Sequence, residues 1–389
     1  MNANSGSRNI LALNVGSDSL KAASYALPDG SETPSPVARE TGRLSDVIAH
    51  RAPQDVEAAW RELLADVAAR LPGLDTQPDV VVHRIVHGAD RDGPTEMTPD
   101  EIAQLGELSS MAPLHQPRAL ALIRAAMQCW PAASQVGVFD TSWHQTMPEK
   151  YRVLPIPHAM YARGVKRYGF HGLAFQSAMR ELGRIAPEIS QRRIVLAHLG
   201  GGSSLCAVRA GLSVNTTMGM TPLGGIPMET RTGSMDPGVL LHLQRSVGMK
   251  VDQIDQLLWR ESGMKGLSGE SGDMRHLLAS NSSGAGLALD VYVAGVVQGI
   301  AAMAACIQGI DALVFSGGIG THAPEVRARV VAELQWLGLG IDAQANQSGT
   351  AELTSSEATT RTFAVAVDEE REMADAIVSL PKAGANQSG

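Results

Sequence analysis

Two stretches of the chain share one pattern, and this repetition constrains the fold more than any other feature of the sequence. Residues 10–19 read ILALNVGSDS and residues 194–203 read IVLAHLGGGS. In each stretch an apolar strand reaches a polar residue, Asn14 or His198, then an apolar residue, then a turn of glycine and serine. Such a duplication predicts two related domains that each present a strand–turn–strand unit to a shared cleft. Chance similarity between two strand–turn units is the alternative.

The rest of the chain alternates apolar strands with helical patterns, and each strand ends at a glycine or an acidic turn. This alternation predicts an α/β protein with ligand sites at the ends of strands. A basic stretch at 162–172 marks a hinge between domains. Strands are expected at 10–13, 20–27, 80–88, 135–143, 194–208, 312–320 and 363–367, and a loop or irregular hairpin at 28–46. Helices are expected at 53–71, 98–110, 117–129, 173–182, 237–248, 251–260, 287–308, 323–336 and 371–380.

Bulk properties narrow the class of protein. A chain of 389 residues is too long for one core, and a formal net charge of −8 argues against a nucleic-acid scaffold. The three cysteines stand far apart in apolar contexts, which fits a reducing compartment, and the N-terminus lacks a signal pattern. The most membrane-like run, 287–315, is interrupted by polar residues, so a buried helix followed by a strand is expected there. We therefore predict a cytoplasmic protein with neither a nucleic-acid nor a membrane partner.

The chemistry-bearing residues point to phosphate. Between residues 198 and 237, triple glycine followed by serine suits a phosphate bound by backbone N–H groups, and a plain hairpin turn is the alternative. Asp140 lies at the polar end of the strand predicted at 135–143, where a metal ligand is favoured over a capping residue. No Walker A sequence, protein-kinase motif set, GxGxxG fingerprint, His-Glu-x-x-His or GxSxG elbow occurs. The remaining set of glycine turns, Arg, His and scattered acids suits phosphoryl transfer.

Several blocks of the sequence are similar to the acetate kinase family. ALNVGSDSLK resembles that family's Asn-x-Gly-Ser-x-Ser-x-Lys signature, and further blocks follow in the family's order: HRIVHG, APLHQP, VFDTSWHQTMP, RYGFHG, HLGGGSS, TMGMTPLGGIPMETRTGSMDP, SGDMR and FSGGIG. The resemblance covers nearly the whole chain. It implies a duplicated actin-like ATPase (ribonuclease H-like) fold, with domains at 1–150 and 151–370 and a closing helix within 371–389 that packs on the first domain. It also implies a homodimer that converts acetate and ATP, with Mg²⁺ or with Mn²⁺ in its place, to acetyl phosphate and ADP.

The resemblance implies a role for each matching residue of the reaction centre. Arg84 and Arg231 would bind the substrate carboxylate and the transferring phosphoryl group, which suits guanidinium forks. His171 and His198 would donate hydrogen bonds to the same oxygens. Asp140 matches the family's essential aspartate; because an acetate oxygen is already ionised, we expect Asp140 to orient arginine and the metal shell rather than move a proton. The magnesium positions of the family match Asn14 and Glu369, both oxygen donors.

The implied substrate and nucleotide sites draw on several further segments. Lys21 and the backbone of 198–202 are expected at the phosphates, and 273–275 and 318–322 at the adenosine side. The implied nucleotide-binding residues are Ser17, Ser19, Lys21, His198, Leu199, Gly200, Gly201, Gly202, Asp273, Met274, Arg275, Gly318, Ile319, Gly320, Thr321 and His322. Val86, Leu114, Phe170 and Pro222 match a small pocket for the substrate methyl group, and all four are equally typical of a plain core. Because one methylene is worth about 1–3 kcal/mol, acetate against propionate stays open.

Three departures from the family pattern all fall on the nucleotide side. Asp18 stands where a serine is usual, Gly201 replaces an asparagine, and Thr321 with the following histidine replaces Glu-Asn. The phosphoryl donor, or the affinity for it, is therefore where this chain is expected to differ. A propionate kinase, a degenerate nucleotide-gated switch with little turnover, and a sugar or polyol kinase are the alternatives. The retained site residues argue against the switch, and the blocks do not match a sugar kinase.

Overall fold

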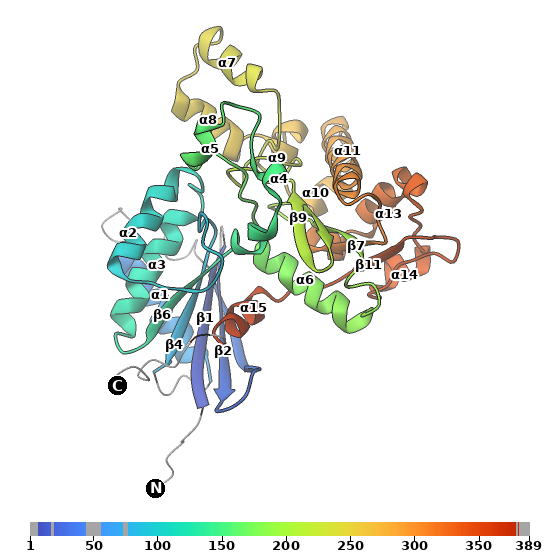
Figure 1. Cartoon of the computed structure of the whole chain (residues 1–389). Helices are drawn as coiled ribbons and strands as arrows, with labels where there is room; N and C mark the ends of the chain where they lie inside the picture. The colour runs from blue at the N-terminus through green and yellow to red at the C-terminus, as the bar shows by residue number, and fades with distance from the viewer. Residues whose placement is uncertain (1–6, 17–18, 44–55, 73–76, 379, 381–389) are drawn as a thin grey trace. The chain divides into compact units, whose positions relative to one another are not determined.

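The computed structural model describes residues 7–16, 19–43, 56–72, 77–378 and 380. Its contacts divide the chain into two compact units (Figure 1). Unit 1 consists of Met1–Trp143 and Asp368–Gly389, and unit 2 consists of His144–Val367. The chain therefore leaves unit 1, forms unit 2 and returns to unit 1 near its end. The limits implied by the resemblance, 150/151 and 370/371, lie within a few residues of these crossings and stay predictions.

Unit 1 is built on a six-stranded sheet in the order β3-β2-β1-β4-β6-β5. Strands β1 (Ser7–Val15), β4 (Val80–Ile85) and β6 (Ser134–Phe139) are parallel neighbours. Strand β2 (Ser19–Pro28) pairs antiparallel with both β1 and β3 (Ser35–Arg43), and the short β5 (Thr95–Glu96) is antiparallel to β6. Strands β2 and β3 form a hairpin with a register shift between Ser24 and Tyr25, so the described part of 28–46 is the irregular hairpin of the two expected alternatives.

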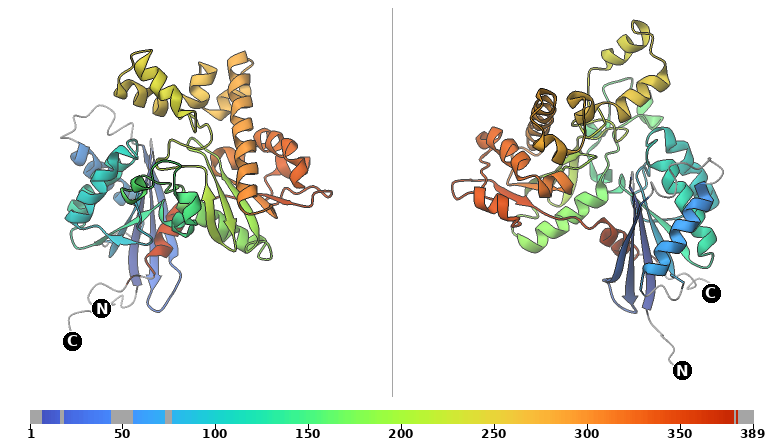
Figure 2. Two further views of the ribbon diagram at one scale, coloured as in Figure 1. Left: turned by 45° about the horizontal axis from the view of Figure 1, so that its top comes forward. Right: turned by 180° about the vertical axis from the view of Figure 1, so that it is seen from behind.

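Helices cover both faces of this sheet. Leu11 and Leu13 of β1 pack with Trp60 and Leu64 of α1 (Val56–Arg70) and with Ala126 of α3 (Gln116–Cys129). Successive strand residues point to opposite faces, so Asn14, between the core residues Leu13 and Val15, points away from this core. There it meets α15 (Glu369–Ala376), which packs against β1, β2 and β4 (Figure 2). Helix α2 (Pro99–Glu107) and η2 (Leu108–Ser110) pack beside α3.

Unit 2 repeats this strand order. Its sheet runs β11-β10-β7-β8-β9, formed by β7 (Arg193–His198), β8 (Ser204–Arg209), β9 (Leu212–Thr216), β10 (Ala312–Ser316) and β11 (Arg361–Ala364). In each unit the first strand pairs antiparallel with the second and the second with the third. The first strand is also parallel to the fourth, which is parallel to the next strand of the order. The shared order confirms that the two strand–turn units belong to a duplicated fold.

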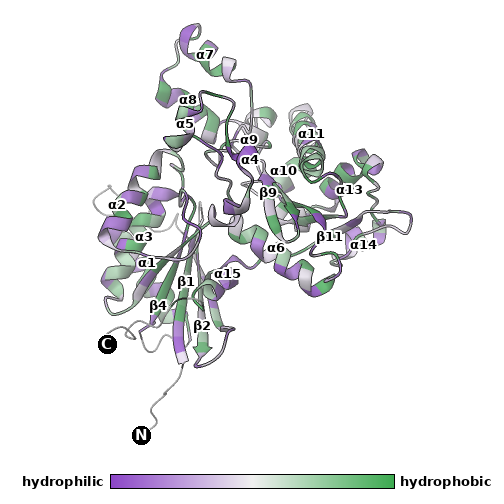
Figure 3. Cartoon of the chain, in the orientation of Figure 1, coloured by the Kyte–Doolittle hydropathy of each residue, from purple (hydrophilic) through white to green (hydrophobic). Residues whose placement is uncertain are grey.

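The core of unit 2 lies between its sheet and the long helix α11 (Ser283–Cys306). Val195 and Ala197 of β7 pack with Tyr292 and Val296 of α11 and with α13 (Pro324–Glu333). Helix α6 (Gly172–Ile185) contacts β7 and shows the alternation of hydrophobic and hydrophilic residues expected of an amphipathic helix (Figure 3). The other helices are η3 (Ser142–Thr146), α4 (Glu149–Arg152), α5 (Ala159–Ala162), α7 (Pro237–Arg245), α8 (Val251–Arg260), α9 (Gly263–Ser268), α10 (Met274–Ala279), α12 (Gly317–His322), η4 (Gln335–Leu337) and α14 (Ala343–Ser348).

Helix α11 was expected to be a buried helix and is buried along one side. Among the described residues it is the one helix long and apolar enough to cross a membrane, judged by length and composition alone. In its most apolar window 44% of the residues are buried within the structure. A core helix of this length meets the same criterion, so the feature is weak support for a membrane span.

Candidate active site

Three neighbouring strand ends and one helix start bring four predicted site residues together in unit 1. Asn14 lies near the end of β1 and Arg84 near the end of β4, while Asp140 directly follows β6. Glu369 is the first residue of α15, which Asp368 caps by accepting a hydrogen bond from the N–H of Arg371 at 3.0 Å. Because β1, β4 and β6 are parallel, their carboxyl ends share one edge of the sheet, where α/β proteins bind ligands.

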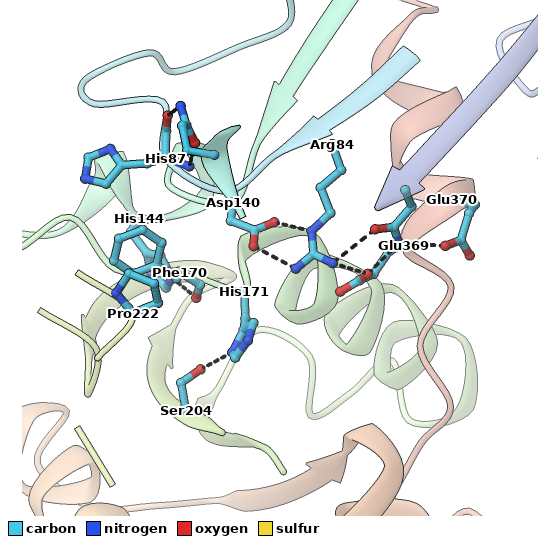
Figure 4. Close-up of polar contacts among 12 residues, drawn as sticks. Arg84, His87, Asp140, His144, Phe170, His171, Ser204, Pro222, Glu369 and Glu370 are labelled. Carbon is cyan, nitrogen blue, oxygen red and sulfur yellow. Dashed lines mark hydrogen bonds and ion pairs between the residues drawn. The ribbon is translucent and has the colours of Figure 1, made fainter. Parts of the chain in front are cut away.

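Arg84 is the centre of this group (Figure 4). Its Nε and Nη2 donate to the two oxygens of Asp140 at 2.9 and 2.8 Å, and its Nη1 donates to Glu369 at 2.9 Å and to Asn14 Oδ1 at 3.2 Å. Burial alone would lower the pKa of Arg84, but Asp140 and Glu369 outweigh it and hold that pKa above its ordinary value. Of the five guanidinium hydrogens, one on Nη2 has no acceptor among the described residues. The arginine is thus fixed in place with one donor for a substrate oxygen.

Asn14 and Glu369 are oxygen donors of the kind that Mg²⁺ prefers. Asn14 Nδ2 donates to Glu369 Oε2 at 2.8 Å and to Glu370 Oε1 at 2.6 Å, which fixes the amide so that Oδ1 is turned toward Arg84. No group of three or more His, Cys, Asp or Glu side chains that could hold a metal occurs within the described part of the chain. One carboxylate and one amide oxygen fit a Mg²⁺ that keeps several waters and binds with phosphates.

Two histidines of unit 2 lie side by side, each held by a serine. The rings of His171 and His198 are 4.9 Å apart between centroids. His171 Nδ1 lies 2.8 Å from Ser204 Oγ, and His198 Nδ1 lies 3.1 Å from Ser316 Oγ. His171 occupies the left-handed region at φ 61°, directly before α6, a conformation that costs a non-glycine residue of order 1 kcal/mol or more. The His171 ring is therefore carried by a backbone conformation that is costly for a non-glycine residue.

Arg231 is a buried cation that forms no direct ion pair with a carboxylate among the described residues. Its Nη1 donates to the Pro222 carbonyl at 3.0 Å and lies 3.7 Å from the sulfur of Met228, and its guanidinium lies 5.7 Å from the centroid of the Trp259 ring. Burial lowers the pKa of Arg231 to about 10, while Glu229 acts in the opposite direction. The side chain remains charged at neutral pH and is suited to receive an anion.

Arg231 and His171 reach the same space over the glycine loop. A Cβ added to Gly202 would lie 3.2 Å from His171 Nε2 and 3.5 Å from Arg231 Nη1. Ser203 stabilises the loop. Its hydroxyl oxygen lies 3.1 Å from the N–H nitrogen of Gly200 and 2.9 Å from the carbonyl oxygen of Gly200. The loop thus presents backbone, an imidazole nitrogen and a guanidinium together, which is an arrangement suited to an anion.

The segment at 317–322 is joined to this loop through Leu199. The Leu199 carbonyl accepts hydrogen bonds from the N–H groups of Ile319 at 2.9 Å and Gly320 at 3.1 Å. Gly317 adopts φ +78°, and a Cβ there would lie 2.5 Å from the Leu199 carbonyl oxygen, so no other residue fits the approach. Gly318 is exposed with no atom within 4 Å of an added Cβ, which leaves its backbone open to a ligand.

The remaining predicted nucleotide residues differ in their surroundings. Asp273 caps α10 and pairs with Arg275 at 2.6 Å on the surface, while the side chain of Met274 is buried in the core, so it can meet a ligand only through its backbone. Thr321 Oγ1 donates to the Gly317 carbonyl at 2.8 Å, and His322 is exposed. In unit 1, Ser19 begins β2 and Lys21 is paired with Asn14 in the strand register. Ser17 and Asp18 lie outside the described residues.

The four predicted pocket residues are divided between the two units. Val86 is buried and Leu114 is half-buried in unit 1, and Phe170 and Pro222 are buried in unit 2. The carbonyl oxygen of Phe170 contacts His144 Nε2 at 3.0 Å, and that of Pro222 accepts the hydrogen bond from Arg231. The backbone of both unit 2 residues is therefore tied to the polar part of the site.

Several supporting residues were not assigned a role from the sequence. Gln116 accepts a hydrogen bond from the N–H of His87 at 3.2 Å and donates to the His87 carbonyl at 3.0 Å, which fixes the segment after Arg84. His144 contacts Ser213 Oγ at 2.8 Å as well as Phe170, so it fixes the residue before His171. Both lie in the recognised blocks APLHQP and VFDTSWHQTMP, which was the available signal. Ser204 and Ser316 likewise lie in the recognised blocks HLGGGSS and FSGGIG, whereas Glu370 lies in none of the recognised blocks.

The two sheets share one strand order, and in each unit polar residues and a glycine turn lie at the end of the first strand. These features define a duplicated actin-like ATPase fold with two domains. Within this class of fold, comparison with known proteins identifies the family. The Acetokinase family model matches residues 9–375, and the chain belongs to that family.

Relatives that align with most of the chain are named acetate kinases. The chain is 42% identical over 313 residues to an acetate kinase of Methylocella silvestris, covering 80% of this chain and 77% of the relative. It is 36% identical over 400 residues to an acetate kinase of Synechococcus sp., covering 96% and 99% of the two chains.

Solved structures agree in fold. A propionate kinase from Francisella tularensis matches with a TM-score of 0.81 at 29% identity, covering 95% of this chain and 98% of its own. Porphyromonas gingivalis acetate kinase matches with a TM-score of 0.78 at 30% identity, covering 94% and 98%.

Proposed function

We propose that the protein is an acetate kinase, which transfers the γ-phosphoryl group of ATP to acetate and forms acetyl phosphate and ADP reversibly. Membership of the Acetokinase family and relatives named acetate kinase support this activity. The observation that carries it is Arg231, a buried guanidinium that forms no direct ion pair among the described residues and lies beside His171 and a glycine loop. Such a group suits the negative charge of a transferring phosphoryl.

In the proposed mechanism the protein positions the reactants and neutralises charge. Arg84, fixed by Asp140 and Glu369, binds the acetate carboxylate, while Arg231 and His171 take up charge on the phosphoryl oxygens. Acetate is already an ionised nucleophile, so direct in-line transfer needs no general base, and Asp140 serves by orienting Arg84. Asn14 and Glu369 would hold Mg²⁺, or Mn²⁺ in its place, which supplies further neutralisation at the phosphates when bound.

A hydroxamate assay tests this function. The protein is incubated with ATP, Mg²⁺ and hydroxylamine together with acetate, propionate or butyrate, and acyl hydroxamate is measured. We expect product with acetate and its loss when EDTA removes the metal. Absence of product with every acid, while ATP still binds, would leave the nucleotide-gated switch as the better description. A parallel reaction with pyrophosphate in place of ATP tests the donor.

Propionate is the second candidate acceptor, because the propionate kinase of Francisella tularensis matches this fold with a TM-score of 0.81. We propose that buried Val86 limits the size of the acyl group. Val86→Ala should then raise kcat/KM for propionate relative to acetate by about tenfold, as expected for one methylene. An unchanged ratio of the two kcat/KM values would show that Val86 does not limit the size of the acyl group.

We also propose a homodimer located in the cytoplasm. Residues in and around α7 and α8 leave large apolar side chains exposed, among them Leu241 at 48%, Val247 at 57% and Val251 at 66%, which supports burial against a second copy. Sedimentation of the purified protein measures the mass, and Leu241→Glu should shift it toward the monomer. Fractionation of the source cells tests the location.

A further inference from the structure

Glu229 lies between the two unit 2 segments assigned to the nucleotide. A Cβ added to Gly201, in the phosphate loop, would lie 2.6 Å from Glu229 Oε2. A Cβ added to Gly272, directly before the segment at 273–275, would lie 2.6 Å from Glu229 Cγ. The Glu229 side chain thus occupies space that a side chain at Gly201 or at Gly272 would fill.

The backbone holds Glu229 in this place. Its N–H donates to the Gly201 carbonyl at 3.3 Å, and its own carbonyl accepts from the N–H of Lys265 at 2.9 Å. A Cβ on Gly272 would also lie 2.5 Å from that carbonyl oxygen, so the two strands of chain touch closely. The side chain is partly exposed rather than sealed in the core. The backbone of Glu229 is therefore fixed, and the residue is partly accessible to a ligand.

A carboxylate at this point has a restricted choice of ligand groups. Placed against phosphate oxygens it would repel them, because both groups are negative. An ionised carboxylate offers acceptors only, and hydroxyl groups are the uncharged donors of a nucleotide. Ribose carries two adjacent hydroxyls and joins the phosphates to the base, so it spans the interval between the phosphate loop and the adenosine segment. Carboxylates bind ribose hydroxyls in other nucleotide sites for the same reason.

We propose that Glu229 accepts hydrogen bonds from the 2′- and 3′-hydroxyls of the donor nucleotide and so makes the enzyme specific for nucleoside phosphates over inorganic ones. This inference rests on the proposed kinase function and adds the residue that recognises the donor's sugar. It also gives a reason for Gly201, where the family pattern has asparagine: a side chain at that position would collide with the Glu229 carboxylate.

The test compares ATP with 2′,3′-dideoxy-ATP in the wild type and in Glu229→Ala. Hydrogen bonds to a charged acceptor are worth enough to change kcat/KM on the order of tenfold or more. We expect the wild type to prefer ATP by that factor and Glu229→Ala to use both donors equally, at the rate of the wild type with the dideoxy analogue. Glu333→Gln, an exposed carboxylate at the end of α13, should keep the wild-type preference.

Two results would overturn the inference. One is an equal preference for ATP in the wild type and in Glu229→Ala; the other is an equal loss with both donors, which would assign Glu229 to the charge balance of Arg231. Gly201→Ala is the second variant: its Cβ displaces the carboxylate, and we expect the same selective loss of preference for ATP.

Failure of the kinase function itself is distinguishable from failure of this inference. If no acid yields product in the wild type, the affinities for ADP and 2′,3′-dideoxy-ADP still report on Glu229 by calorimetry. A weaker affinity of the wild type for the dideoxy analogue, lost in Glu229→Ala, supports the contact without turnover. Equal affinities of the wild type for the two nucleotides refute it.

Discussion

Ser204 Oγ lies 2.8 Å from Nδ1 of His171, and this contact gives the two ring nitrogens different tasks. If the serine hydroxyl donates to Nδ1, the imidazole proton resides on Nε2. Nε2 is the nitrogen directed to the space over Gly202 that Arg231 also reaches. The neutral ring then donates to a phosphoryl oxygen without needing to be protonated.

Ser204→Ala is expected to lower kcat about tenfold and to change the KM values for ATP and acetate by less than about twofold. The substitution removes one hydrogen bond that orients a donor needed in the transition state, and leaves the binding groups in place. Steady-state hydroxamate assays measure both quantities. A variant with wild-type kcat, or one whose only change is in KM, would contradict this role of Ser204.

Asp140→Asn is expected to lower both turnover and stability. Asp140 is 1% exposed and accepts two hydrogen bonds from Arg84, and an amide can offer only one acceptor on that edge. Disrupting a buried ion pair costs on the order of 3 kcal/mol of unfolding free energy, and the misplaced arginine should reduce kcat about a hundredfold. Urea unfolding and the hydroxamate assay measure the two effects.

Glu369→Gln provides the matched comparison for Asp140→Asn. It removes the negative charge of a side chain that accepts one hydrogen bond from Arg84, at 2.9 Å, against the two that Asp140 accepts, and its position is also the implied metal position. We therefore expect a smaller loss of stability and a higher Mg²⁺ concentration at half-maximal rate. Equal Mg²⁺ requirements in the wild type and Glu369→Gln would argue against a metal at this carboxylate.

The duplication was readable in the sequence because it depends on local pattern. Asn14 and His198 each follow an apolar run and precede a glycine turn, and strands of that kind pair in the same order in both sheets. The placing of Arg84 and Asp140 at one edge follows from parallel strands that end at polar residues. The sequence could not decide between a loop and an irregular hairpin at 28–46, because the mostly polar β3 has no periodic apolar face.

The supporting contacts of the site could not be read in the same way. Ser204 and His171 are 33 residues apart, and Ser213 and His144 are 69 apart, so each pair depends on how a strand register meets a distant loop. The space for Glu229 depends on two glycines that approach it from different segments. No periodicity or motif encodes such distances, which arise only when the unit is folded.

Arg231→Lys is expected to lower kcat by a factor of about a hundred to a thousand while leaving the fold intact. Lysine keeps the positive charge but loses the planar fork and its packing against the Trp259 ring. The burial that lowers the pKa of Arg231 to about 10 should bring a lysine there to roughly 8, because lysine starts about two units lower. Activity of the variant requires the charged form, so its residual rate should fall as the pH rises through about 8. Near-normal turnover, or a flat pH profile between 7 and 9, would contradict this account.

Two buried histidines should make stability depend on pH below neutrality. Burial lowers the pKa of His83 in unit 1 and of His144 in unit 2 to about 4, against about 6.5 in an unfolded chain. Between these values the unfolded chain binds protons that the folded protein does not. The free energy of unfolding therefore falls as the pH is lowered from about 6.5 toward 4, by up to about 3 kcal/mol for each histidine.

His83→Gln tests this dependence on the histidine that is farther from the proposed chemistry. His83 Nε2 contacts Gln135 Oε1 at 2.8 Å, and the amide of a glutamine can donate to the same oxygen. Urea unfolding of unit 1, followed at pH 7.5, 6.5, 5.5 and 4.5, should show a shallower loss for the variant than for the wild type, by about one proton. At pH 7.5 both histidines are neutral in either state, so that measurement isolates the packing cost of the substitution. Parallel curves for the two proteins from pH 7.5 to 4.5 would mean that His83 is not the group whose protonation opposes folding.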